Sequence, residues 1–378
     1  MTQKKSELEA LIAAGIISEE TAQQIAAYWQ SQKQTSASRL PIVFSILGGL
    51  LVGLGIILVV AHNWDDLSHL SKLIFAFLPV LIGQAAGLYT LLKQPQSRAW
   101  REGSSVFLLF AIGACIAMVS QIYHIEGELS AFLYGWIWLA LPIMYVMDSA
   151  IASLLFWIGI SMYAINFSDG LYPRQPAYWY CFFAAVAFPF YWMIRKQRPD
   201  SNYERFHNWV IPISLASCLG TLFTGRLMMN WVNYQVFYIV LFIVGYWLLK
   251  RENRLLSNGW IMIGLIGTVA IAVMQSFFDY WDYSKDLWPE SWASADTFYV
   301  LVGLMIVYIG LIVFTGRKDP TIFRHPIPYI GAFSIILHLL GDGFPFTGAV
   351  LGNLMVLGLG LYYIWQGTKQ DHLLILNF

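Results

Sequence analysis

Two glutamines end otherwise apolar stretches, where a side-chain amide could bind a polar ligand. Gln121 ends the segment "AIGACIAMVSQ" and Gln275 ends "LIGTVAIAVMQ", and each lies eight residues after a glycine. An amide in apolar surroundings is costly without a hydrogen-bond partner. Each glutamine is therefore expected either to bond to a neighbouring helix or to line a polar cavity, and their matched placement favours a shared cavity.

A histidine and an aspartate occur together further along the chain. His338 precedes Asp342 by four residues, a spacing that places both on one face of a helix. This spacing is typical of a structural pair, and a proton relay is the functional alternative.

Arg226, in "LFTGRLMMNW", is flanked on both sides by apolar sequence. Three roles are open to it: reaching the membrane interface with its long side chain, pairing with Asp65 or Asp66, or binding an anion. Four residues have ligand-type side chains but no diagnostic metal spacing: His62, His124, Asp65 and Glu126. The chain has no P-loop, GxSxG, HExxH or dinucleotide fingerprint. No metal, cofactor or catalytic residue is predicted.

The elements that position these residues must be membrane helices. The chain has 378 residues, of which 58% are hydrophobic and only 12% charged, against about 25% charged in an ordinary soluble domain. Lys plus Arg (22) equals Asp plus Glu (22), so net charge gives no indication of nucleic-acid binding. The composition predicts an all-α polytopic membrane protein with the lipid bilayer as its main partner.

Apolar runs of about 17 to 25 residues predict twelve transmembrane helices. The expected spans are 40–62, 72–92, 104–123, 129–147, 149–167, 177–195, 208–225, 233–250, 257–278, 297–316, 326–340 and 345–365.

The orientation follows from the basic residues, because cytoplasmic loops retain Lys and Arg. With the N-terminus inside, all of the 22 Lys and Arg except Lys72, Arg174, Arg226 and Lys285 fall on the inner side. We therefore expect a multi-pass membrane protein with a cytoplasmic N-terminus.

Residues 1–39 are expected to hold a cytoplasmic helical hairpin. In "SELEALIAAGIISEETAQQIAAYWQSQ", Gly15 breaks the first apolar stripe and Ser18 can cap the second helix. The hairpin is expected to pack on the inner loops or the lipid surface, or else to bind a protein partner.

Three short patterns recur in order and suggest an internal duplication. Asn63 and Trp64 in "HNW" match Asn230 and its tryptophan in "MNW", Gln121 matches Gln275, and the "DG" after the fifth span matches the "DG" at Asp342. A shift of six spans preserves orientation, so the halves would be parallel repeats. The expected division is residues 40–206 and 207–378.

All of these patterns lie on the predicted outer side of the membrane. The candidate outer polar site comprises Asn63, Trp64, Asp65, Asp66, Gln121, His124, Arg226, Asn230, Gln275, His338 and Asp342.

The first part of the chain resembles a known bacterial membrane family, domain of unknown function 2157. The resemblance covers about residues 7–150 and rests on "LIAAGIISEETAQQI", "GLGIILVVAHNWDDL" and "AMVSQIYHIEGE". It implies a bacterial cytoplasmic-membrane protein and carries no activity. Members of that family continue into further apolar spans after a segment like "DHLLILNF", so the resemblance leaves open whether the chain is complete at Phe378.

Three functions remain open at this point. The repeat with its paired amides favours transport or translocation of a small or lipid-linked envelope solute through an outward-facing polar cavity. A non-catalytic scaffold or sensor acting through the N-terminal hairpin is the second hypothesis. The third is an enzyme acting on a lipid-linked substrate, like the polytopic glycosyltransferases that place an acid in the first outer loop, where Asp65 and Asp66 would lie.

Overall fold

A computed structural model describes residues 14–15, 18–25, 66–168, 176–222, 227–249, 258–285, 295–341 and 344–370, and these residues form helices and no strands. The chain divides into two units, residues 1–72 and 73–378, each considered by itself. In the first unit Gly15 has a φ of +66°, and the backbone N–H of Thr21 donates to Ser18 Oγ at 3.2 Å. The predicted cap at Ser18 is confirmed. The rest of the hairpin and the first predicted span lie outside the described residues.

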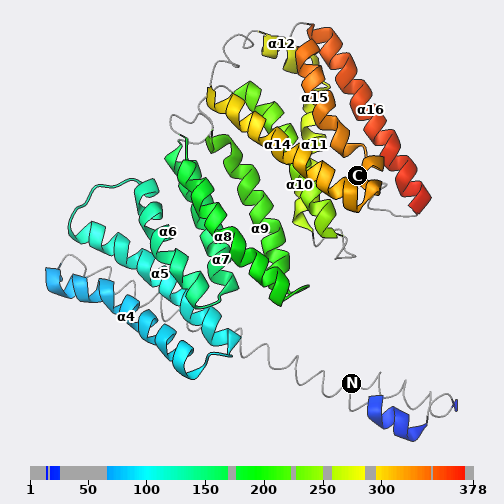
Figure 1. The fold of residues 1–378 in the computed structure, drawn as a ribbon. Helices are drawn as coiled ribbons and strands as arrows, with labels where there is room; N and C mark the ends of the chain where they lie inside the picture. Colours follow the sequence, from blue (N-terminus) through cyan, green and yellow to red (C-terminus); the bar gives the residue numbers. More distant parts are fainter. Residues whose placement is uncertain are drawn as a thin grey trace. The chain divides into compact units, whose positions relative to one another are not determined.

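Most of the described residues belong to helices (Figure 1). Their bounds are α4 (His69–Lys93), α5 (Arg98–Ile122), α6 (Leu129–Val146), α7 (Ala150–Phe167), α8 (Tyr178–Gln197), α9 (Asn202–Cys218), η1 (Leu219–Leu222), α10 (Leu227–Leu249), α11 (Gly259–Met274), α12 (Phe278–Lys285), α14 (Ala295–Lys318), η3 (Pro320–Arg324), α15 (Ile327–Gly341) and α16 (Pro345–Gln370).

These helices confirm the expectation of an all-helical, multi-pass membrane protein. Seven of the described helices are long and apolar enough to cross a membrane, and two shorter ones, Gly259–Met274 and Ile327–His338, are also apolar. Every span predicted from residue 72 onward coincides with a helix. The boundaries differ most at the start of the second half: α10 begins at Leu227, so Asn230 lies in its first turn and not at the end of the preceding helix.

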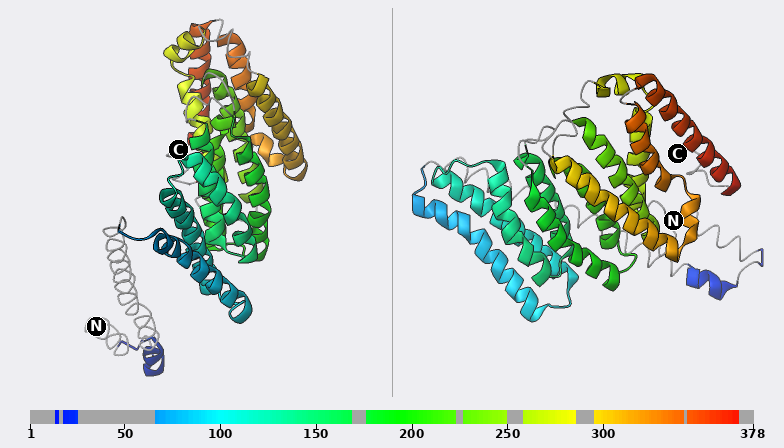
Figure 2. Two further views of the ribbon diagram at one scale, coloured as in Figure 1. Left: turned by 90° about the vertical axis from the view of Figure 1, so that its left-hand side faces the viewer. Right: turned by 45° about the horizontal axis from the view of Figure 1, so that its top comes forward.

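The helix α10 is the packing centre of the helices that follow α9. It contacts α11, α14 and α15, and its described side chains are mostly apolar and buried, although the buried set also includes the polar Asn233 and Gln235. The green α10 lies among the yellow and orange helices in the views of Figure 2. Its close approach to α11 depends on Gly264, where a Cβ atom would lie 2.4 Å from the backbone N of Phe242.

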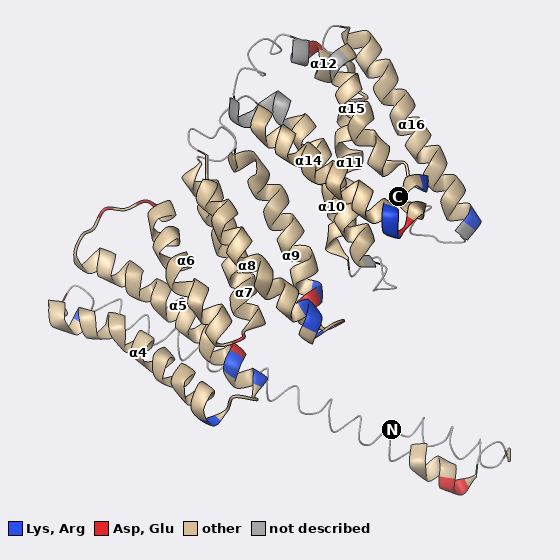
Figure 3. Cartoon of the chain, in the orientation of Figure 1, with Lys and Arg blue, Asp and Glu red and all other residues tan. Residues whose placement is uncertain are grey.

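The helices from α5 to α9 pack around α7, which contacts α5, α6, α8 and α9. Phe156, Trp157 and Ile160 of α7 are at most 1% exposed and form the centre of an apolar core. Many outward-facing side chains of the described helices are large and apolar, as expected where lipid replaces water. Lys and Arg lie mostly at helix ends (Figure 3), for example Lys93 at the end of α4 and Arg98 at the start of α5.

Candidate functional site

The candidate outer residues fall into three groups in the structure. Asn63, Trp64, Asp65, Arg226 and Asp342 lie outside the described residues, and for Asn230 only the backbone is described. Asp66, Gln121 and His124 are exposed. Gln275 and His338 are buried.

Gln121 and His124 lie together where α5 ends. Gln121 is in the last turn of that helix, and His124 follows it in a left-handed conformation, with a φ of +47°. The chain turns here through a hydrogen bond from the N–H of Ile125 to the carbonyl O of Ser120 at 2.9 Å. Both side chains are exposed at the surface of the described helices.

Gln275 ends α11 and is completely buried. Its side-chain Oε1 accepts a hydrogen bond from Ser334 Oγ of α15 at 2.9 Å, and its backbone O accepts one from Trp281 Nε1 of α12 at 2.7 Å. Its amide Nε2 has no hydrogen-bond partner within the part of the chain that the structure describes. The glutamine thus joins three helices and keeps a buried donor group available.

His338 lies one turn after Ser334 on α15. Its Nδ1 is 2.8 Å from the carbonyl O of Ser334, so Nδ1 must carry the proton. Its Nε2 is 2.8 Å from the hydroxyl of Tyr280 on α12, from which the neutral ring accepts a hydrogen bond. Ser334 therefore links the two residues, because its hydroxyl binds Gln275 and its carbonyl binds His338.

Trp281 fixes the short helix α12 over this cluster. Its indole is fully buried and packs against both Gly341 and Gly348, where added Cβ atoms would be 2.5 and 2.6 Å from ring carbons. By its sequence alone, the acidic and aromatic segment 277–296 favours an interfacial lid at the lipid headgroups over a calcium-binding loop. In the structure, residues 278–285 of this segment form α12, and Trp281 is a core residue. The other tryptophans of that segment lie outside the described residues.

We call Gln275, Tyr280, Trp281, Ser334 and His338 the outer cluster. It offers a buried amide donor, a neutral imidazole and a phenol, groups suited to binding a polar solute or passing a proton. Tyr280 and Ser334 were missed from the sequence, although the spacing of four between Ser334 and His338 was a usable signal. Within the described residues no three His, Cys, Asp or Glu side chains gather closely enough to hold a metal ion.

A second set of buried polar residues lies at the opposite, basic ends of the helices. Arg195 of α8 pairs with Glu204 of α9, with 2.8 Å between Nη1 and Oε1 and side-chain exposures of 4% and 3%. Nearby, the Tyr191 hydroxyl donates to Asn208 Oδ1 at 2.7 Å. These contacts join α8 to α9 and require no ligand.

The tight turn between α6 and α7 is held by charges from other helices. Glu102 of α5 accepts hydrogen bonds from the backbone N–H groups of Ala150 at 3.0 Å and Ile151 at 2.9 Å, and so caps α7. Asp148 pairs with Arg98 at 2.7 Å and also with Arg198. Burial lowers the pKa of Arg198, and the carboxylate of Asp148 opposes this shift.

A family model described as "Predicted membrane protein (DUF2157)" matches residues 9–153. This match confirms the resemblance expected from the first part of the sequence. No curated protein and no solved structure matches the chain. The outer cluster lies wholly after the matched segment.

Proposed function

We propose that the protein transports or translocates a small or lipid-linked envelope solute across the bacterial inner membrane, with the outer cluster in its polar path. The observation that carries this proposal is the buried amide of Gln275, whose Nε2 has no partner among the described residues. A buried donor without a partner costs about 1–3 kcal/mol. Polar and ionisable groups inside a membrane bundle commonly mark solute or proton pathways.

The chemistry of the outer cluster favours a solute that carries hydrogen-bond acceptors. Gln275 Nε2 can donate to a carbonyl, carboxylate or phosphate oxygen. His338 can also accept a proton at Nε2, after which Tyr280 would accept a hydrogen bond in place of donating one. A proton could therefore accompany the solute without loss of the contact between α12 and α15.

The proposal includes twelve spans, two parallel halves at residues 40–206 and 207–378, and a cytoplasmic N-terminus. The placement of Gln121 and Gln275, each at the C-terminal end of its helix, supports the duplication. The different surroundings of the two glutamines, one exposed and one buried, support a polar path beside Gln275.

Cysteine labelling tests whether water reaches the outer cluster. The full chain is prepared in proteoliposomes with Cys115, Cys181 and Cys218 replaced by alanine, and Ser334→Cys is treated with a water-soluble methanethiosulfonate reagent. Ala272→Cys, one turn before Gln275 and also fully buried, is the matched control. The proposal predicts labelling of Ser334→Cys and protection of Ala272→Cys. Equal protection of both in folded protein would count against a polar path.

A scaffold or sensor function is the second candidate, because the family match begins at residue 9 and ends before the outer cluster. A function shared by that family would then reside in the N-terminal hairpin and the first spans. Deleting residues 6–32 in the native host tests this alternative. A function that is lost on deletion of the hairpin but kept in the Gln275→Leu variant would support the scaffold. Full function without the hairpin would argue against it.

A further inference from the structure

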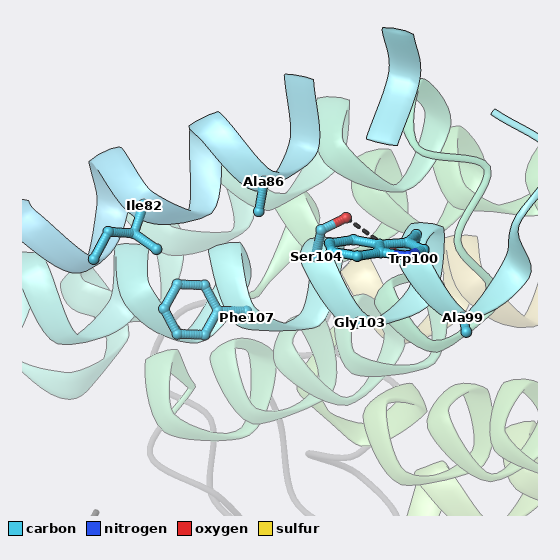
Figure 4. A pocket seen from close by; sticks show the side chains of 7 residues that line it. All are labelled: Ile82, Ala86, Ala99, Trp100, Gly103, Ser104 and Phe107. Carbon is cyan, nitrogen blue, oxygen red and sulfur yellow. Dashed lines mark hydrogen bonds between the residues drawn. The ribbon is translucent and has the colours of Figure 1, made fainter. Parts of the chain in front are cut away.

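An open groove runs between α4 and α5 (Figure 4). Ile82 and Ala86 line it from α4, and the α5 side is formed by Ala99, Trp100, Gly103, Ser104 and Phe107. Its volume is about 410 Å³ and its walls are almost entirely apolar. Ser104 contributes little polarity, because its hydroxyl donates to the carbonyl O of Trp100 at 2.6 Å.

The groove exists because α4 and α5 contact each other along one line, while small residues beside that line leave space between the helices. Gly83 packs directly on Leu108, where an added Cβ would lie 3.1 Å from the Cα atom, and Thr90 Oγ1 is 3.2 Å from Ser104 Oγ. Next to these contacts, Ala86 and Gly103 leave the space unfilled. A Cβ atom built on Gly103 would meet nothing within 4 Å.

The groove lies at the basic ends of its helices. From Ala99 to Phe107 it covers about 12 Å of α5, by the rise per residue of a helix, which is comparable to the depth of one leaflet's hydrocarbon. Trp100 and Tyr89, with ring centroids 5.1 Å apart and both partly exposed, form an aromatic pair of the kind found at membrane interfaces.

The charges at this end favour an anion. Arg98 is paired with Asp148, and Arg101 donates to the carbonyl O atoms of Pro95 and Met147. Lys93, the last residue of α4, is exposed, and no ion pair of its ammonium group occurs among the described residues. Lys93 follows the lining residue Ala86 by seven residues, about two turns, and so lies on the same face of α4. An apolar groove and an available cation on one helix face match the two parts of an anionic phospholipid.

We propose that the α4–α5 groove binds one acyl chain of an anionic phospholipid from the surrounding leaflet, and that Lys93 binds its phosphate. A lysine near a membrane surface contributes enough attraction to an anionic lipid to favour it about fivefold. The shape of the groove selects the chain, and the charge of Lys93 selects the headgroup.

Native mass spectrometry of the full chain in detergent tests this site. The probes are phosphatidylglycerol and phosphatidylcholine with identical acyl chains, added in equal amounts. The wild-type protein should retain one phosphatidylglycerol about five times more often than phosphatidylcholine. Gly103→Leu fills the groove, and because leucine has a higher helix propensity than glycine the variant should fold. It should retain several-fold less of either lipid.

Gly310→Leu on α14 is the matched control, since a Cβ there also meets nothing within 4 Å. It should retain lipid as the wild type does. Lys93→Gln should remove the preference for phosphatidylglycerol and leave retention of phosphatidylcholine unchanged. Equal retention by wild type and Gly103→Leu would overturn the groove as a lipid site, and an unchanged preference in Lys93→Gln would overturn the role of Lys93.

Discussion

The buried ion pair between Arg195 and Glu204 gives the sharpest energetic prediction for the fold. Its charged atoms are 2.8 Å apart and both side chains are at most 4% exposed. At an effective dielectric constant of about 20, Coulomb attraction contributes about 6 kcal/mol. Desolvation of the two ions, several kcal/mol each, largely offsets this gain. The pair as a whole therefore contributes little, but losing one member is costly.

Replacing Glu204 by glutamine should destabilise the protein by about 3 kcal/mol, at the lower end of the range for broken buried pairs. Arg195 would keep only partial compensation, including its 3.4 Å hydrogen bond to the carbonyl O of Leu248. Asp200 would also lose a charged acceptor, because its N–H donates to Glu204 Oε2 at 2.7 Å. Such a change corresponds to roughly a 150-fold shift in the unfolding equilibrium.

Reversible unfolding in mixed micelles of SDS and a mild detergent measures these differences. The double variant Arg195→Met with Glu204→Leu removes both charges. Its loss of stability should be smaller, by about 2 kcal/mol or more, than the summed losses of the single variants Arg195→Met and Glu204→Leu. Two results would contradict this prediction: a cost below about 1 kcal/mol for Glu204→Gln, or a double variant whose loss equals the sum of the two single losses.

Three further predictions concern the second half. Gly352→Ala should destabilise the protein, because its Cβ would lie 2.2 Å from the backbone O of Gln275, whereas Gly358→Ala, with open space around it, should stabilise by about 0.5–1 kcal/mol; equal unfolding midpoints would contradict this contrast. Ser334→Ala leaves Gln275 Oε1 buried without its donor and should cost about 1–3 kcal/mol in the same unfolding assay; a cost near zero would mean that another group replaces the hydroxyl. Burial lowers the pKa of His325 below 6.5 in the folded protein. The stability that the neutral histidine allows is therefore complete above pH 6.5 and is lost as the pH falls toward the folded-state pKa. His325→Gln should lose less stability than the wild type in that pH range, and an equal loss would contradict the prediction.

Sequence patterns predicted the helices well because membrane insertion depends mainly on local composition. Apolar runs located the longer helices from α4 to α16, but they did not predict the short helix α12, which lies in the segment 277–296, whose sequence favours a loop. The predicted ends differ most where polar or charged residues continue a helix beyond its apolar part. Thus α5 starts at Arg98 and α9 at Asn202, although their apolar segments begin later. A charged residue next to an apolar run therefore marks the membrane interface, and the helix itself can continue beyond that residue.

Patterns could not predict the surroundings of individual polar residues. Gln121 and Gln275 share their residue type and their distance from a glycine, yet one is exposed and the other is fully buried. The difference arises from α12, whose Trp281 packs against Gly341 and Gly348 and donates a hydrogen bond to the carbonyl O of Gln275 at the end of α11. The contact of Trp281 with the two glycines joins residues about 60 positions apart in the chain. The periodicity of a local segment therefore cannot predict it.

An experimental density map of the full chain in lipid nanodiscs would show directly whether the outer cluster binds a solute. We expect density for a solute or ordered water within about 3 Å of Gln275 Nε2, next to His338 and Tyr280. A protein group that fills that position and satisfies the amide would rule out a solute site there.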